Sequence, residues 1–241
     1  MSVDTRIVLG TAGWNLPREQ WPAFPSEGTH LQRYAGRLPG VEINSSFYRP
    51  HRPATYAKWA QSVPAAFRFC VKLPRQITHE RRLVDCGEWL ERFLYECGHL
   101  EEKLGCLLIQ LLPSLTYEAE TARVFFDALR VRHAGPVVIE PRHRSWLDAE
   151  PLLQQAQIAR VVADPPPFPE AALPGGWPGF HYYRLHGSPL VYRSRYGIGW
   201  LEAMAERLAD RPKGAASWCI FDNTASGAAT ANALELQRLL S

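Results

Sequence analysis

Several features that mark special classes of protein are missing from this sequence. No run of about 18 apolar residues is present, so we expect no membrane-spanning helix and no membrane partner. The five cysteines contain no C-x-x-C pair, and an odd number cannot all pair within one chain, which favours free thiols in a reducing compartment. Residues 1–10 carry Asp4 and Arg6 before a short apolar run, unlike a signal peptide. These absences predict a cytoplasmic location.

An excess of charge of one sign is also missing. The chain has 27 basic and 24 acidic residues, and its formal net charge of +3 is too small to require nucleic acid as a partner. Lysine is scarce, and the four lysines are Lys58, Lys72, Lys103 and Lys213. What is present is an ordinary globular composition, with 46% hydrophobic and 21% charged residues over 241 positions. This length fits a single domain, residues 1–241, better than two enzyme domains.

Short apolar runs alternate with helix-compatible stretches along the whole chain. The expected strands are Ile7–Thr11, Val41–Ser45, Arg68–Leu73, Cys106–Leu111, Val137–Glu140, Arg160–Ala163, His181–Leu185 and Trp218–Phe221. The expected helices are Leu31–Leu38, Ala54–Ser62, Glu88–Leu100, Glu118–Arg130, Asp148–Gln157, Trp200–Ala209 and Ala228–Leu240. The proline-rich stretch from Asp164 to Pro178 predicts a loop or one short helical turn. This pattern predicts an α/β fold, a single (β/α)8 TIM-type barrel. An open doubly wound sheet is the alternative, disfavoured because no G-x-G-x-x-G or G-x-x-x-x-G-K-[ST] loop follows a strand.

Polar residues stand at nearly every expected strand end, where the active site of such a barrel lies. Side chains alternate along a strand, so Glu42 and Asn44, Glu140 and Arg142, and Arg184 and His186 are pairs that share a face. The candidate catalytic residues are Glu42, Lys72, Glu140 and His186. The candidate substrate-binding residues are Trp14, Asn44, Tyr48, His79, Gln110, Arg142, His143, Asp164, Arg184, Asp222 and Asn223. Buried charges need either mutual pairing or a ligand, so a structural ion-pair network that fills the barrel end is the alternative interpretation.

Seven short stretches follow one another along the chain: Gly10–Trp14, Glu42–Tyr48, Ile77–His79, Gln110–Pro113, Arg142–Trp146, Arg184–Gly187 and Asp222–Thr224. Together they resemble the YecE-like family, also called domain of unknown function 72. The resemblance covers essentially the whole chain. It implies a TIM-type barrel distantly similar to the xylose-isomerase and endonuclease-IV groups, and it implies no particular activity. Asp222 departs from the family's usual asparagine and replaces an amide by an ionisable group.

The first hypothesis for function is acid/base catalysis on a small anionic substrate that bears a phosphate or a carboxylate. Lys72, Arg142 and Arg184 hold the anion, while Glu42, Glu140 or His186 moves the proton. The reaction is then that of a hydrolase, lyase or isomerase, with no cofactor and no metal. Lys72 has two readings, as a Schiff-base lysine if it is desolvated, or as the ion-pair partner of Glu42.

Two other hypotheses come from different classes of function. A divalent-metal phosphodiesterase would use Glu140, Asp164 and His186 as ligands, although the neighbouring arginines would repel a cation. A non-catalytic binder of nucleic acid or a metabolite would stack bases or sugars on an aromatic mouth. That mouth would consist of Trp14, Phe47, Tyr48, Trp146 and Tyr196. The small net charge makes nucleic acid an unlikely partner. The sequence does not predict the oligomeric state.

Overall fold

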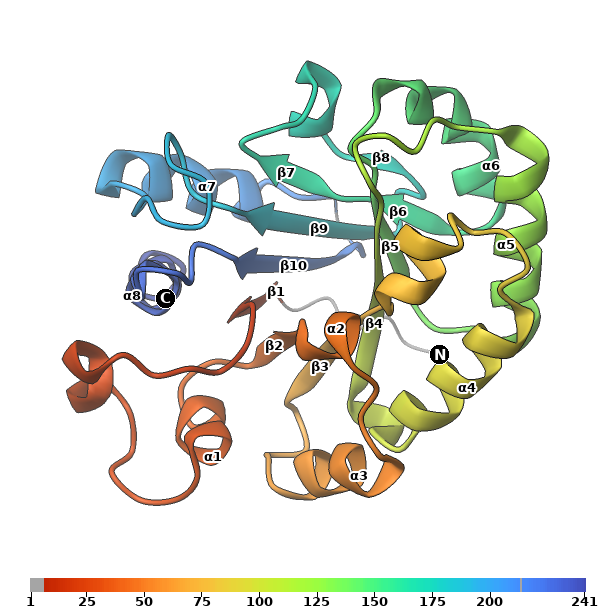
Figure 1. Ribbon diagram of the computed structural model, residues 1–241. Coiled ribbons are helices and arrows are strands. Elements are labelled where there is room, and N and C mark those ends of the chain that lie inside the picture. Colours follow the sequence, from red (N-terminus) through yellow and green to blue (C-terminus); the bar gives the residue numbers. More distant parts are fainter. Residues whose placement is uncertain (1–6, 213) are drawn as a thin grey trace.

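The computed structural model describes residues 7–212 and 214–241 (Figure 1). The strands are β1 Ile7–Thr11, β2 Gly40–Ile43, β3 Arg68–Lys72, β4 Leu104–Gln110, β5 Val137–Glu140, β6 Ile158–Arg160, β7 Val162–Asp164, β8 Gly175–Gly176, β9 Phe180–Leu185 and β10 Ala216–Phe221. Within the described residues they form a six-stranded sheet, β2-β3-β4-β5-β6-β8, and a four-stranded sheet, β1-β10-β9-β7. All pairings are parallel except that of β6 with β8. The chain therefore has an α/β fold with mixed sheets.

Helices follow most strands and lie outside them in Figure 1, so that the strands occupy the centre of the molecule. They are α1 His30–Ala35, α2 Ser45–Tyr48, α3 Pro53–Gln61, α4 Gly87–Gly98, α5 Ala119–Arg132, α6 Glu150–Gln155, α7 Ile198–Ala209 and α8 Ala228–Leu239. Local chemistry fixes several of their ends. Thr29 and Gln32 form a capping box at the start of α1, and the Glu118 carboxylate accepts two backbone N–H groups at the start of α5. Among the described residues, no helix combines the length and the apolar character needed to cross a bilayer.

The two sheets meet at two places. On one side β6 and β7 are consecutive and are separated only by Val161, whose amide donates to the Ile139 carbonyl at 2.8 Å. On the other side, Ala12 and Glu42 form an isolated parallel bridge, and the Gly13 amide donates to the Glu42 carbonyl at 2.8 Å. Gly10 allows this approach of β1 to β2, because a Cβ atom there would overlap the carbonyl of Gly40. The strand pairings alone do not make a complete ring.

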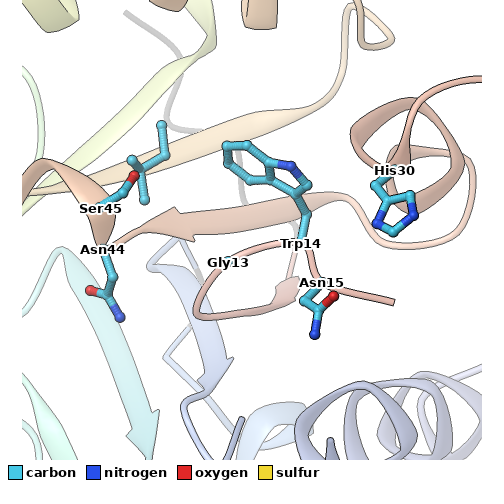
Figure 2. A pocket seen from close by; sticks show the side chains of 7 residues that line it. Gly13, Trp14, Asn15, His30, Asn44 and Ser45 are labelled. Atoms are coloured by element: carbon cyan, nitrogen blue, oxygen red, sulfur yellow. The ribbon is translucent and has the colours of Figure 1, made fainter. Parts of the chain in front are cut away.

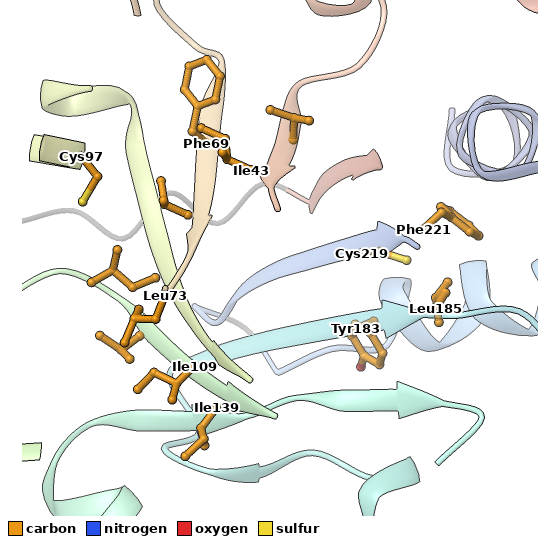
Figure 3. Close-up of a cluster of buried hydrophobic side chains, with 14 of the residues drawn as sticks. Ile43, Phe69, Leu73, Cys97, Ile109, Ile139, Tyr183, Leu185, Cys219 and Phe221 are labelled. Atoms are coloured by element: carbon orange, nitrogen blue, oxygen red, sulfur yellow. The ribbon is translucent and has the colours of Figure 1, made fainter. Parts of the chain in front are cut away.

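Buried apolar side chains form two separate clusters on opposite faces of the strands. One cluster lies between strands and helices and includes Phe69, Ile109, Ile139 and Phe221 (Figure 3). The second, here called the inner cluster, is made by alternate residues of the same strands. Its members are Val8, Cys70, Cys106, Leu108, Val138, Ala159, Val161, Phe180, Tyr182, Ala216, Trp218 and Ile220.

On β3, β4 and β5 the inner face becomes polar two residues further along the strand. Lys72 follows Cys70, Gln110 follows Leu108, and Glu140 follows Val138. The strand alternation therefore carries the polar candidates to the face that the inner cluster occupies, at the carboxyl ends of the strands.

Most of the predicted elements are confirmed, and the errors have identifiable causes. The strand expected at Val41–Ser45 ends at Ile43, because Ser45 already begins α2. The sixth expected strand is divided into β6 and β7, which belong to different sheets. The expected helix Asp148–Gln157 is shorter, since a 3-10 helix over Arg144–Ala149 precedes α6. The short helical turn predicted in the proline-rich stretch is present at Pro169–Ala172, but the antiparallel strand β8 was not predicted.

Candidate functional site

Arg184 on β9 lies at the centre of a buried ionic cluster and is 1% exposed. Its guanidinium donates to both carboxylate oxygens of Glu42, with Nη2 to Oε1 at 2.7 Å and Nε to Oε2 at 3.0 Å. Nη1 donates to Oε2 of Glu140 at 2.9 Å, and Nη2 lies 2.9 Å from Oδ2 of Asp222. The planar fork of arginine suits this arrangement, because it can serve several carboxylates at once. Burial alone would lower the pKa of Arg184, but the three carboxylates raise it well above its usual value.

His186, two residues beyond Arg184, bridges two of the same carboxylates. Its Nε2 lies 3.0 Å from Oε1 of Glu140, and its Nδ1 lies 3.1 Å from Oδ2 of Asp222. Burial would lower the pKa of His186, but the two carboxylates outweigh it and raise the pKa. Burial would raise the pKa values of Glu140 and Asp222, yet Arg184 and His186 hold both below their usual values. The favoured state is an imidazolium that donates to two carboxylates.

Tyr182 is a member of this cluster that the sequence analysis missed. Its hydroxyl donates to Oε2 of Glu42 at 2.7 Å, so that Glu42 is fully engaged by Tyr182 and Arg184. Tyr182 stands two residues before Arg184 on β9 and therefore shares its face. The same alternation that paired Arg184 with His186 could have identified it.

Lys72 at the end of β3 lies beside the cluster without joining it. The predicted ion pair with Glu42 is wrong, because Arg184 occupies that carboxylate. Among the described residues, Lys72 makes no side-chain hydrogen bond or ion pair, although it is only 7% exposed. Its Nζ lies 4.2 Å from the centre of the Phe47 ring. Burial and the nearby charge of Arg184 lower the pKa of Lys72 to about 8, against the opposing effect of Glu42, Glu140 and Asp222.

Arg142 forms the more open edge of the cluster. Its Nη2 donates to Oε1 of Glu140 at 3.0 Å, and its side chain is 22% exposed. It also hydrogen-bonds the side chain of Tyr192, whose ring meets that of His186 edge-on at 5.6 Å between centroids. The sequence analysis missed Tyr192 because its place depends on the path of the loop after β9. The Tyr192 amide donates to the His186 carbonyl, and the Tyr192 carbonyl accepts from the Ala225 amide. These two hydrogen bonds hold the loop after β9 against the cluster.

His79 and Gln110 lie near the same edge. The ring of His79 packs edge-on against Phe47 at 4.8 Å, and its Nδ1 lies 2.8 Å from the Thr78 hydroxyl. Burial, together with Lys72 and two arginines, lowers the pKa of His79 to about 4. With this pKa, His79 is a neutral imidazole at neutral pH.

Gln110 pairs in register with Glu140 across β4 and β5 and is 9% exposed.

A separate pocket of about 340 Å³ lies where β1 and β2 end (Figure 2). It is lined by Gly13, Trp14, Asn15, His30, Ile43, Asn44 and Ser45. Trp14 packs edge-on against Trp59 at 5.0 Å, and in the described part of the chain the buried Oδ1 of Asn44 has no hydrogen-bond partner. Two predicted binding residues, Trp14 and Asn44, thus line this pocket.

Other predicted binding residues have local partners outside the cluster. His143 accepts the Ser145 amide and caps the 3-10 helix after β5, while Asp164 accepts the Tyr196 hydroxyl at 2.8 Å. Asn223 donates to the Ser194 carbonyl and to Asn232. Tyr48 is 70% exposed and packs on Phe47. Whether these residues contact a ligand stays a prediction.

The expected aromatic mouth is not assembled as the sequence suggested. Trp146 is 1% exposed and donates through its indole N–H to the Leu115 carbonyl, and Tyr196 is 4% exposed. Both rings belong to the packed interior, so neither can stack on a base or sugar. Their loops were correctly placed after strands, but sequence position cannot distinguish a buried loop aromatic from an exposed one.

Comparison with known proteins places this arrangement in a family. A family model described as "Protein of unknown function DUF72" matches residues 8–241. The chain belongs to this family. The resemblance drawn from the short sequence stretches is confirmed.

Relatives of this DUF72 chain occur in Escherichia coli and Bacillus subtilis. It is 30% identical to YecE of Escherichia coli K12 over 136 residues, which are 53% of this chain and 48% of YecE. It is 25% identical to YunF of Bacillus subtilis 168 over 181 residues, 70% of this chain and 64% of YunF. The aligned part is less than two thirds of either curated relative.

Solved structures support the fold of the DUF72 chain. A DUF72 family protein of Enterococcus faecalis V583 superposes with a TM-score of 0.79 at 23% identity, covering 98% of this chain and 95% of that one. A DUF72 family protein of Thermotoga maritima MSB8 gives a TM-score of 0.74 at 25% identity, covering 97% and 98%. These similarities establish a shared fold. The chemistry of the site depends on its side chains.

The three ligands of the metal hypothesis do not converge in the DUF72 chain. Both ring nitrogens of His186 face carboxylates of the cluster, whereas the carboxylate of Asp164 faces Tyr196. Within the described ranges, no group of three or more His, Cys, Asp or Glu side chains is arranged to hold a metal ion. The cluster is instead a set of alternating cations and carboxylates. Beside it lies the amine of Lys72, which has no ion-pair partner among the described residues.

Proposed function

We propose that the chain forms one closed (β/α)8 barrel and acts as an enzyme on a small substrate that bears a phosphate or a carboxylate. The barrel is supported by the continuous path from β6 to β7 and by the bridge between Ala12 and Glu42. It is supported further by the inner cluster, whose described members come from the strands and Val161 and from no helix, whereas an open doubly wound sheet packs helices against both faces.

The observation that supports an anionic substrate is the balance of charges in and beside the cluster. Arg142, Arg184 and protonated His186 are matched by three carboxylates, those of Glu42, Glu140 and Asp222. Lys72 adds a positive charge that forms no ion pair with any carboxylate among the described residues. A buried, unpaired cation is costly, and an anion bound beside it removes that cost.

The hydrogen bonds assign different tasks to the cations. Arg184 has no open face, since Nε, Nη1 and Nη2 all contact carboxylates, so it positions the cluster rather than the substrate. Arg142 is partly exposed and is the better anion ligand. Glu42, Glu140 and His186 were expected to move the proton, but their bonds favour a positioning role.

Lys72 is the group best suited to proton transfer. Its pKa of about 8 places both the ammonium and the amine forms within reach near neutral pH. An anion bound between Lys72 and Arg142 would raise that pKa and draw a proton onto the amine. Anion binding and proton movement are therefore coupled at one atom.

Isothermal titration calorimetry with inorganic phosphate and with malonate tests this proposal. At pH 8 we expect each anion to bind with uptake of a fraction of a proton, seen as a heat that changes between buffers of different ionisation enthalpy. Arg142→Met should weaken binding about tenfold, equal to about 1.4 kcal/mol. The matched control is Arg132→Met, at the carboxyl end of α5 and so at the opposite end of the sheet. Lys72→Met should abolish the proton uptake, whereas Lys58→Met on the exposed face of α3 should not.

The same variants also show which result would overturn the proposal. If neither anion binds, or if Arg142→Met and Arg132→Met bind equally well, the cluster is a structural network. A binding heat that does not depend on the buffer would remove Lys72 from the site.

A further inference from the structure

Two lysines of the described chain are buried, and they differ in one respect. Lys103 Nζ donates to the carbonyls of Ala60 and Val63 and so holds the end of α3. Lys72 is buried to a similar degree, 7% exposed against 9%, but among the described residues its amine donates to no acceptor. Lys103 therefore has a structural task that accounts for its burial. The burial of Lys72 requires another explanation, because an unpaired ammonium destabilises a folded protein.

The surroundings of Lys72 keep its amine available for reaction. Glu42, Glu140 and Asp222 are the carboxylates near it, and each is engaged by Arg184 or His186. His79 packs on the same Phe47 ring and is neutral, so it offers no countercharge. Desolvation beside another cation is one of the known ways in which a lysine becomes a nucleophile. A neutral amine is present near neutral pH because the pKa of Lys72 is about 8.

We propose that Lys72 forms an imine with the carbonyl group of an anionic substrate, such as a 2-oxo acid or a phosphorylated ketone. This proposal rests on the proposed function and names its substrate class. The carbonyl carbon would meet Nζ over the Phe47 ring, while Arg142 holds the anionic group. Lys72 ends β3 and Arg142 follows β5, and only β4 separates these two strands in the six-stranded sheet, so both residues lie at the carboxyl end of that sheet.

The reaction balances without any other reactant. The lone pair of Nζ attacks the carbonyl carbon, a C–N bond forms, and the oxygen gains a proton to give a carbinolamine. The nitrogen then forms a C=N bond while the C–O bond breaks and the oxygen leaves as water, carrying the two hydrogens of the amine. Protonation of the imine by solvent gives an iminium ion, a cation that the face of Phe47 stabilises as it does the ammonium.

Reductive trapping tests the imine directly. The full chain is incubated with pyruvate or with dihydroxyacetone phosphate in the presence of sodium cyanoborohydride, which delivers hydride to the imine carbon and leaves a stable secondary amine. Peptide mass spectrometry then measures the label at each lysine. We expect saturable labelling of Lys72 at least tenfold above that of the exposed Lys58, because Lys58 lacks both the desolvation and the anion ligand. The preferred probe shows whether the anionic group is a carboxylate or a phosphate.

Three variants make the result specific. Lys72→Arg keeps the positive charge but has no nucleophilic amine, so the label on the peptide that contains position 72 should be lost. Lys58→Met should leave the labelling of Lys72 unchanged. Arg142→Met should reduce that labelling about tenfold at a subsaturating probe concentration.

The outcomes separate this inference from the proposed function. Equal labelling of Lys72 and Lys58, or no label at Lys72, overturns the imine. If malonate still binds and depends on Arg142 in that case, the anion site stands alone. If Lys72 is labelled equally in wild type and Arg142→Met, the imine stands and the anion ligand is wrong. If neither labelling nor malonate binding occurs, both proposals fail.

Discussion

At the scale of single residues, the cluster depends on Arg184, which pairs with the carboxylates of Glu42 on β2, Glu140 on β5 and Asp222 just after β10. A buried ion pair contributes little net stability compared with an apolar core, but removing one partner leaves an uncompensated charge. The network therefore fixes geometry more than it stabilises the fold. The hydrogen bonds of the network fix the positions of Glu140 and His186 beside Arg142 and Lys72.

The raised pKa of His186 makes stability depend on pH in a predictable direction. Because the folded pKa lies above the unfolded value of 6.5, protonated His186 contributes stability that is complete below about pH 6.5 and is lost as the pH rises through the folded pKa. We expect the stability advantage of wild type over His186→Asn to fall between pH 6 and pH 9, by about 1.4 kcal/mol for each unit of pKa shift. Urea unfolding across this range measures it.

The control for this prediction is His30→Asn, at the exposed start of α1. Its stability difference from wild type should stay constant over the same pH range. An advantage of wild type over His186→Asn that stays flat, or that grows as the pH rises, would show that His186 is not held as an imidazolium.

At the scale of elements, the alternation of side chains along a strand allowed the sequence to predict which polar residues share a face. Spacings of two residues placed Glu140 with Arg142 and Arg184 with His186 on common faces. In the structure, the Glu140 carboxylate contacts Arg142, Arg184 and His186. Alternation says nothing of which charge pairs with which across the sheet, so Glu42 was assigned to Lys72 when Arg184 holds it.

Loops were less predictable than strands for a physical reason. The place of Tyr192 depends on backbone hydrogen bonds of the loop after β9, and these have no periodic signal. The burial of Trp146 depends on packing against α5 and on one hydrogen bond to Leu115. Such tertiary contacts join segments about thirty residues apart, which a local pattern cannot register.

Lys103, just before β4, binds the end of α3, and this contact between two elements gives a prediction. Its ammonium satisfies the carbonyls of Ala60 and Val63, where α3 ends. Lys103→Met keeps the apolar stem but leaves both carbonyls buried without that donor, so we expect a loss of about 1–3 kcal/mol in the free energy of unfolding. Lys58→Met on the exposed face of the same helix should change it by less than about 0.5 kcal/mol. Equal effects in urea unfolding would contradict the capping role.

At the scale of the whole molecule, the site requires both sheets. Glu42 and Glu140 belong to the six-stranded sheet, whereas Arg184 belongs to the four-stranded sheet. The cluster itself therefore binds the two sheets together at their carboxyl ends. The alternation of strands and helices predicted the α/β fold from sequence, but the structure divides the strands into two sheets, and within the described residues β1 and β2 pair directly at one bridge.

The seam between β1 and β2 offers a test of the proposed barrel closure. A Cβ atom at Gly10 would overlap the Gly40 carbonyl, so Gly10→Ala must push β1 away from β2. We expect a loss of about 1–3 kcal/mol in the free energy of unfolding, the usual cost of overpacking. The Gly13 amide, which donates to Glu42, should also exchange its hydrogen faster. Gly98→Ala, at the exposed end of α4 with open space around it, should cost nothing. If Gly10→Ala matches Gly98→Ala in both measurements, the two sheets do not close against each other at this seam.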